Sequence, residues 1–399
     1  MSALPGGRPA SRATLFVLAL GHGCADLCSG GLFGLLPFLV VERHYSYAAA
    51  GVFALTTSLA SAVLQPLVGA HGDRSEAHWL LPAGLLATGL GFGAVGFATS
   101  YPLTLVAVAL CSAGVASYHP EGARWARHAS SIRVTEDMSV FSVGGGAGYA
   151  VGPLVVAAVL APLGLHGTAV VAVIPFAAAA VVFVALRRFR SLPVVARGDH
   201  QAAERLASEW RPFAVLVALF CLASGAITGL LTYVPLLVHS RGSSTAASSA
   251  MTSVLLAAAA AGTLIGGIAA QRLGRRFVLL VPQLVLVPAI ALLPSLGFAA
   301  MLPMMVLIGI AMNANVSVVL VLAQEYLPEH MGLATGLTIG LCGGIGGLIV
   351  AGLGFLGDAA GLTPVFYALA ALPLLVVVLA SQLPRPEAAP AGTLWGLRD

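Results

Sequence analysis

Two carboxylates lie inside apolar stretches of the chain, where an ionised side chain is costly. Glu121 follows His119 and Pro120 near the end of one apolar run, and Asp26 lies within the first long run. An ionised group in hydrocarbon costs several kcal/mol unless it is paired or protonated. Acids retained at such positions indicate a functional role, and the chemistry that suits them is proton handling.

The first of these acids has a histidine one helical turn before it. His22 and Asp26 are four residues apart, so in a helix both side chains face the same side. A neutral imidazole can hydrogen-bond to the carboxylate or share its proton. A static pair between Asp26 and a buried donor is the alternative, and we predict that His22 and Asp26 take part in proton coupling.

The second acid belongs to a cluster with a histidine, a proline and an arginine. Pro120 removes a backbone donor, which predicts an interruption of the helix between His119 and Glu121. Arg124 lies three residues after Glu121 and can pair with it. Glu121 could simply lie beside Arg124 near the cytoplasmic face. We predict instead that His119 and Glu121 contribute to coupling and that Arg124 is the cation for an anionic substrate.

Three amides are further polar points in apolar segments. Gln65 precedes Pro66, and Asn313 and Asn315 lie in a later apolar run. We expect the asparagines to face a cavity or to bond across helices. With Arg124, the three amides form the predicted substrate-binding set.

The elements that must position these residues are membrane helices. The chain has 399 residues, of which 59% are hydrophobic and 9% charged, and its mean hydropathy is +0.97. Soluble domains carry about 25% charged residues, so this composition indicates an integral membrane protein. Twelve apolar runs, each long enough to cross a membrane as a helix, lie at about 14–40, 48–70, 79–98, 102–123, 138–160, 168–187, 212–238, 246–270, 277–296, 299–322, 333–356 and 363–382.

Arginine placement and internal similarity organise these runs into two halves. With a cytoplasmic N-terminus, only Arg43 and Arg241 of the loop arginines fall outside, which predicts that both termini are cytoplasmic. Segments of the first half recur 198 residues later, as in Pro37 and Pro235. We expect an N-terminal six-helix bundle over 1–188, a cytoplasmic loop over 189–211 and a C-terminal bundle over 212–399. Two six-helix halves joined by an arginine-rich loop resemble the major facilitator superfamily.

Two motifs extend this resemblance. The superfamily's cytoplasmic gating motif is matched incompletely in both halves, by Gly69, Asp73, Arg74, Gly274, Arg275 and Arg276. These residues could form a conformational latch or serve only as topology anchors. A stripe of small residues resembles the fifth-helix signature of superfamily antiporters and consists of Gly144, Gly148, Gly152 and Pro153. Close helix packing is the alternative interpretation of this stripe.

The ordered combination of fragments resembles one branch of the superfamily, the fosmidomycin-resistance proteins. The fragments are His22-x3-Asp26 with Pro37, Leu64-Gln65-Pro66, His119-Pro120-Glu121 followed by Arg124, Gly266-Gly267 with Gly274-Arg275-Arg276, and Ala323-Gln324-Glu325. The resemblance implies a proton-linked exporter of a small drug or metabolite, including anionic phosphonates. It also implies a bacterial inner-membrane location.

We therefore expect a proton-coupled antiporter that works by alternating access. Its expected partners are a small-molecule substrate, protons and the lipid bilayer, with the protein acting as a monomer. A proton-independent facilitator or a lipid-moving uniporter is the nearest alternative. No enzymatic motif or nucleotide-binding loop is found. We expect no catalytic residue, no cofactor, no metal site and no nucleic-acid partner.

Overall fold

The computed structural model describes residues 12–72, 77–130, 134–189 and 208–384, and within these ranges every regular element is a helix. The first half comprises α1 (Arg12–Gly34), α2 (Leu36–Arg43), α3 (Tyr47–Gly72), α4 (Leu80–Val95), α5 (Tyr101–Ala129), α6 (Val134–Leu163), η1 (Gly164–Gly167) and α7 (Thr168–Phe189). The second half comprises α8 (Trp210–Ser240), α9 (Thr245–Leu273), α10 (Arg275–Leu292), η2 (Leu293–Ser295), α11 (Phe298–Asn313), α12 (Val316–Tyr326), η3 (Pro328–His330), α13 (Met331–Gly336), η4 (Leu337–Leu341), α14 (Cys342–Ala360) and α15 (Leu362–Ser381).

Helical structure is what an apolar environment demands, because a helix satisfies its backbone hydrogen bonds internally. Ten described segments are long and apolar enough to cross a membrane. One of them, Asp137–Leu186, covers most of both α6 and α7, and the shorter apolar helix α4 lies between α3 and α5. Counted in this way, the twelve predicted spans are confirmed. Large apolar side chains such as Leu264 and Phe355 are exposed on the outer surface, as expected where helices face lipid.

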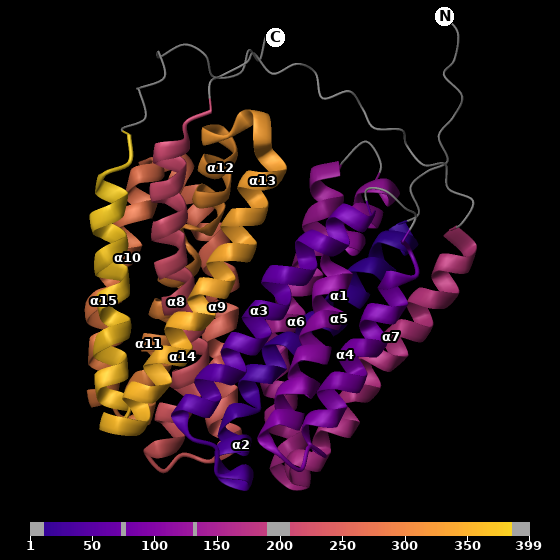
Figure 1. Cartoon of the computed structure of the whole chain (residues 1–399), viewed down its shortest axis with the longest axis horizontal. Helices are drawn as coiled ribbons and strands as arrows, with labels where there is room; N and C mark the ends of the chain where they lie inside the picture. The colour runs from indigo at the N-terminus through magenta and orange to yellow at the C-terminus, as the bar shows by residue number, and fades with distance from the viewer. Residues whose placement is uncertain (1–11, 73–76, 131–133, 190–207, 385–399) are drawn as a thin grey trace, which may run out of the picture.

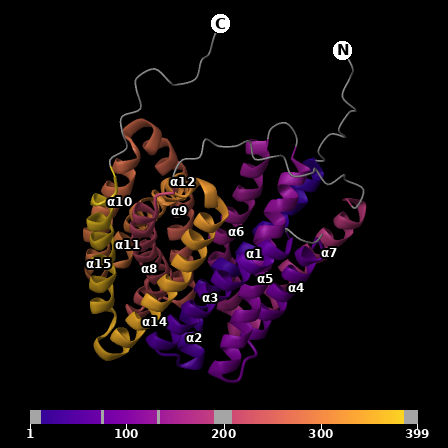
Figure 2. The same cartoon turned by 45° about the horizontal axis from the view of Figure 1, so that its top comes forward.

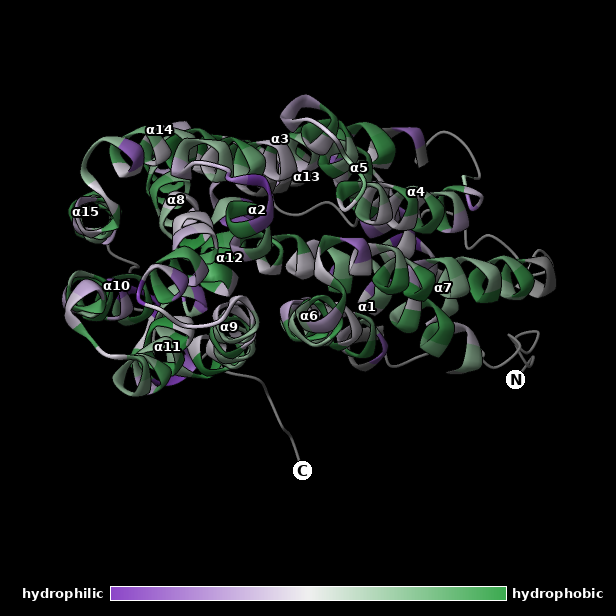
Figure 3. Ribbon diagram, turned by 90° about the horizontal axis from the view of Figure 1, so that it is seen from below, coloured by the Kyte–Doolittle hydropathy of each residue, from purple (hydrophilic) through white to green (hydrophobic). Residues whose placement is uncertain are grey.

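The helices form two groups that lie side by side (Figure 1). The helices α1–α7 make one group and α8–α15 the other, and a turned view keeps the same separation (Figure 2). Viewed from the end at which α2 lies, α6 packs beside α9 and α3 packs beside α14 (Figure 3). These two helix pairs supply most of the contact between the groups.

Hydrogen bonds connect the groups near the end at which α2 lies. Asp358 on α14 accepts bonds from the backbone nitrogens of Tyr47 and Ala48, at 2.7 and 3.1 Å. Ser249 on α9 donates to the carbonyl oxygen of Gly34 on α1. A glycine lets α14 approach this closely, since a Cβ at Gly354 would lie 2.6 Å from the Cα of Ala48. We call these contacts the interlocked end.

One local expectation is wrong. The helix α5 runs without interruption from Tyr101 to Ala129 and contains Pro120 in its interior. A proline costs one backbone hydrogen bond but does not have to break a helix that neighbouring membrane helices hold in place. Predicted spans are interrupted elsewhere: at Leu35, between α1 and α2, and at Ala314 and Asn315, which form a turn between α11 and α12.

Candidate functional site

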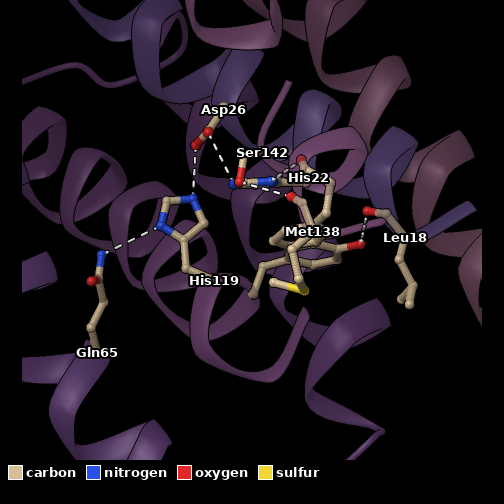
Figure 4. A network of polar contacts seen from close by, with 9 residues as sticks. Leu18, His22, Asp26, Gln65, His119, Met138 and Ser142 are labelled. Carbon is tan, nitrogen blue, oxygen red and sulfur yellow. Dashed lines mark hydrogen bonds and ion pairs between the residues drawn. The ribbon is translucent and has the colours of Figure 1, made fainter. Parts of the chain in front are cut away.

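A carboxylate lies between two imidazoles inside the first group of helices (Figure 4). Asp26 is close to the middle of the path from Arg12 to Arg43 that α1 and α2 make. Its Oδ1 atom is 2.8 Å from Nε2 of His119 on α5, and its Oδ2 atom is 3.3 Å from Nε2 of His22 on α1. All three side chains are mostly buried, with 13% of His22, 14% of Asp26 and 29% of His119 exposed. We call these three residues the His–Asp–His triad.

The outer nitrogen of each imidazole has its own partner. Nδ1 of His22 lies 2.9 Å from the carbonyl oxygen of Phe141 on α6, and the two rings stack with centroids 4.2 Å apart. Nδ1 of His119 lies 3.5 Å from the side-chain amide of Gln65 on α3. Four helices therefore orient the two rings towards one carboxylate.

The hydrogen-bonding pattern has a consequence for charge. A carbonyl oxygen can only accept, so Nδ1 of His22 carries a proton. A neutral His22 ring would then face Asp26 with the lone pair of Nε2. Two lone pairs at 3.3 Å repel each other, and a proton or another positive charge between them removes that repulsion. A positive charge between the inner atoms of the triad is therefore electrostatically favourable.

A glycine on α6 makes room for the triad. A Cβ atom built on Gly145 would lie 2.4 Å from Cε1 of His22 and 2.7 Å from Oδ2 of Asp26. Real Cβ atoms do not approach so closely, so any side chain here would displace the pair. Gly145 is the middle residue of a run of three glycines. The sequence alone does not show that this glycine, rather than its neighbours, faces His22 and Asp26.

Glu121 belongs to a separate cluster. It is 2% exposed and accepts bonds from Nε and Nη2 of Arg124. The indole nitrogen of Trp125 also donates to it at 2.8 Å, a partner that the sequence did not reveal. Because His119 and Glu121 are two residues apart on α5, they point to opposite sides of that helix. The structure brings His22, Asp26 and His119 together and leaves Glu121 with Arg124.

The asparagines lie in the other group of helices. Asn313 ends α11, and Asn315 follows it in the turn before α12. Asn315 is fully buried, and neither polar atom of its side chain has a hydrogen-bond partner within the described ranges. A buried amide of this kind is costly. Within the described part of the chain, no contact places either asparagine next to the triad.

The glycine stripe of α6 packs against α1. Cβ atoms at Gly144, Gly148 and Gly152 would lie 2.4, 1.9 and 2.1 Å from the carbonyl oxygens of Ala19, Gly23 and Leu27. Pro153 continues this contact beside Gly34. Small residues at this spacing let two helix backbones approach. The stripe therefore holds α1 against α6. A role of the stripe in antiport stays a prediction.

The predicted gating residues are described in part. Asp73 and Arg74 lie outside the described residues, while Gly69 is on α3, where an added Cβ would lie 3.9 Å from Pro120. In the second half, Gly274 has a left-handed φ of 90° and separates α9 from α10. Arg275 pairs with Glu325 at the end of α12, and Arg276 lines the same cavity of about 520 Å³.

Comparison with known proteins accounts for this arrangement. The sequence profile described as the Major Facilitator Superfamily matches residues 18–351. The chain belongs to the major facilitator superfamily. Its members are membrane transporters rather than enzymes, and this chain is accordingly a multi-pass membrane transporter.

Two curated superfamily relatives cover nearly the whole chain. An uncharacterized MFS-type transporter of Bacillus subtilis (strain 168), YfnC, is 32% identical over 94% of this chain and 93% of its own length. The fosmidomycin resistance protein of Escherichia coli (strain K12) is 31% identical over 90% of each chain. The predicted family resemblance is confirmed.

Solved structures show the superfamily fold. A crystal structure of the nucleoside transporter NupG superposes with a TM-score of 0.78, at 14% identity over 94% of this chain and 100% of that one. A bacterial homologue of the lysosomal transporter Spinster, in an inward-facing and unoccupied conformation, gives 0.77 at 16% identity, over 94% of this chain and 96% of that one.

Proposed function

We propose that this transporter is a proton-coupled antiporter that exports a small drug or metabolite of the fosmidomycin type. The observation that carries the proposal is the His–Asp–His triad, a buried carboxylate held between two imidazoles. Such a group is costly inside a membrane unless it is paired or protonated, and the two imidazoles can both pair with it and exchange protons with it. The fosmidomycin resistance protein among its relatives supports the substrate class.

In the proposed cycle, the triad binds a proton in one conformation, and the substrate binds after that proton has been released. Protonation of the triad from outside neutralises Asp26 and favours one conformation. Substrate that arrives from the cytoplasm binds when the proton has left. Each pH unit supplies about 1.4 kcal/mol per proton, and each 100 mV supplies about 2.3 kcal/mol per net charge moved. These energies are enough to concentrate a substrate tenfold or more against its gradient.

Alternating access requires the two groups of helices to rock against each other. We assign the moving bodies to residues 1–188 and 212–399, with 189–211 as the cytoplasmic link in a monomer of the inner membrane. The interlocked end supports this assignment, because its bonds through Asp358 and Ser249 are few and reversible. The arginine distribution supports a cytoplasmic location for both termini.

We propose that polar side chains outside the triad recognise the substrate. Gln65 already touches His119 and can turn its amide to a ligand. Asn313 and Asn315 would contribute from the opposite group of helices. Arg124 can bind an anion only after its pair with Glu121 opens.

Reconstituted transport tests the proposal directly. Purified protein in liposomes, given an imposed pH gradient, should drive fosmidomycin counter to proton movement, and a pH-sensitive dye should record the protons. Flux that is independent of the gradient in the intact protein would indicate a facilitator or a uniporter instead. Saturable binding without any flux would indicate a sensor.

A further inference from the structure

We propose that His22, Asp26 and His119 also form a binding site for a divalent transition-metal ion of the Zn²⁺ type. Their inner atoms, one from each side chain, all lie within 4.8 Å of one another. No other group of three histidine, cysteine or acidic side chains in the described part of the chain meets this condition. The inference stands on this geometry and not on the proposed transport cycle.

Two distances in the triad, from Oδ2 of Asp26 to His22 and from Oδ1 of Asp26 to His119, are close to those between the ligands of a tetrahedral ion. Zinc lies about 2.0–2.2 Å from imidazole nitrogen and carboxylate oxygen, which places neighbouring ligand atoms about 3.3 Å apart. Nε2 of His22 and Oδ2 of Asp26 are already 3.3 Å apart. The 2.8 Å bond between His119 and Asp26 needs to open by about half an ångström, a small change for two side chains.

The outer contacts are those that metal-binding histidines need. Such a histidine usually donates its other ring N–H to a carbonyl, a carboxylate or water, which turns the remaining lone pair towards the ion. His22 does this through Nδ1 and the carbonyl oxygen of Phe141. His119 can do the same with Gln65, because the two ends of an amide are assigned by hydrogen bonding and the oxygen can face Nδ1.

The site also offers charge balance and access. One carboxylate and two neutral imidazoles leave a divalent ion with a fourth position open to water or to an anion. Gly145 keeps the inner side free of a side chain. The partial exposure of all three ligands gives an ion a route to the site. Imidazole with a single carboxylate favours zinc, cobalt, nickel or copper over magnesium or calcium.

Equilibrium binding on the purified full-length protein, with its affinity tag removed, tests the inference. Zn²⁺ should bind at one ion per chain in competition with a chromophoric chelator, and Co²⁺ should give the visible absorption of a tetrahedral nitrogen–oxygen site. His22→Gln and His119→Gln should each weaken Zn²⁺ binding by about tenfold or more. His166→Gln is the matched control, because His166 is exposed in η1 and far along the chain from the triad.

The outcomes separate the alternatives. Absence of a one-to-one Co²⁺ spectrum in the wild type would overturn the inference, as would equal Zn²⁺ affinity in the wild type and His22→Gln. His22→Cys restores a ligand atom and should bind metal better than His22→Gln. This result would show that the weaker binding of His22→Gln is not caused by misfolding. Since no pH gradient or substrate is used, failure of metal binding leaves the transport proposal untouched, and failure of transport leaves the metal site untouched.

Discussion

At the scale of single residues, the two membrane acids have different surroundings and should have different roles. Asp26 is shared by two imidazoles and is partly exposed, so its charge can change during a cycle. Glu121 is closed in by Arg124 and Trp125, which donate three hydrogen bonds to its carboxylate. We therefore expect the exchangeable proton at the first acid and a fixed ion pair at the second.

Asp26→Asn should therefore remove gradient-driven transport. The amide keeps the shape of the side chain and can still hydrogen-bond to both imidazoles, with an N–H donor in place of one acceptor oxygen, but it cannot bind and release a proton. We expect proton-coupled flux to fall by about tenfold or more, the equivalent of about 1.4 kcal/mol. Ser224→Ala is the matched control, because Ser224 is the counterpart of Asp26 at the 198-residue offset. Coupled flux that survives in Asp26→Asn would contradict the assignment.

Substitutions in the second cluster should act on stability first. Arg124→Ala leaves the Glu121 carboxylate buried with only the indole N–H, and loss of one partner of a buried pair costs about 3–5 kcal/mol. Glu121→Gln removes the charge itself and should cost less. Thermal denaturation in detergent, followed by size-exclusion fluorescence, measures both variants. The interpretation fails if Glu121→Gln is well folded yet loses proton coupling, because Glu121 would then be the coupling acid.

Sequence reasoning assigned all three residues of the triad to proton coupling, together with Glu121, but predicted only one of the contacts between them. The spacing of His22 and Asp26 fixes them on one face of a helix, so that pair could be predicted. His119 is 93 residues away from Asp26, and only the packing of α5 against α1 brings them together. Sequence proximity grouped His119 with Glu121 instead. Gly145 and the Phe141 carbonyl carried no signal, because their contribution depends on the register of α6 against α1.

At the scale of helices, length and hydropathy predicted the spans well, because membrane thickness sets both. The helix interruption was predicted at the wrong place, because a proline removes only one backbone hydrogen bond and does not by itself end a helix. At Pro120 the packed helix continues, whereas no proline or glycine marks Ala314–Asn315. Polar side chains in that turn give the better clue in retrospect, since Asn315 is buried without a partner in the described structure.

The contact between α1 and α6 gives a sharp test at this scale. A Cβ at Gly148 would lie 1.9 Å from the carbonyl oxygen of Gly23, whereas a Cβ at Gly146 would meet nothing within 4 Å. Gly148→Ala must push α1 away and displace His22 and Asp26, so thermal stability and transport should both fall. Gly146→Ala, a helix-favouring change on the same helix, should leave both unchanged or raise stability slightly. Equal behaviour of the two variants would rule out close packing as the role of the stripe.

At the scale of the whole molecule, opening of the interlocked end has to break bonds between the two groups of helices. The carboxylate of Asp358 is the principal polar contact there, because it accepts two backbone N–H bonds at the start of α3. An anion at a helix N-terminus is favourable, and hydrogen bonds to a charged group contribute about 1.5–3 kcal/mol each when well protected. Asp358 is exposed, so a smaller contribution is expected here.

Asp358→Ala should therefore shift the conformational equilibrium towards separation at this end. Hydrogen–deuterium exchange, read by mass spectrometry, should rise at the start of α3 and also at the start of α9, where Ser249 bonds to Gly34 in a contact that the substitution does not touch. Glu42→Ala is the matched control, because Glu42 accepts the backbone N–H of Leu165 within the first group alone. Its effect should remain local to η1. If exchange after Asp358→Ala rises only at Tyr47 and Ala48, the carboxylate merely caps α3 and the groups of helices are held together by packing.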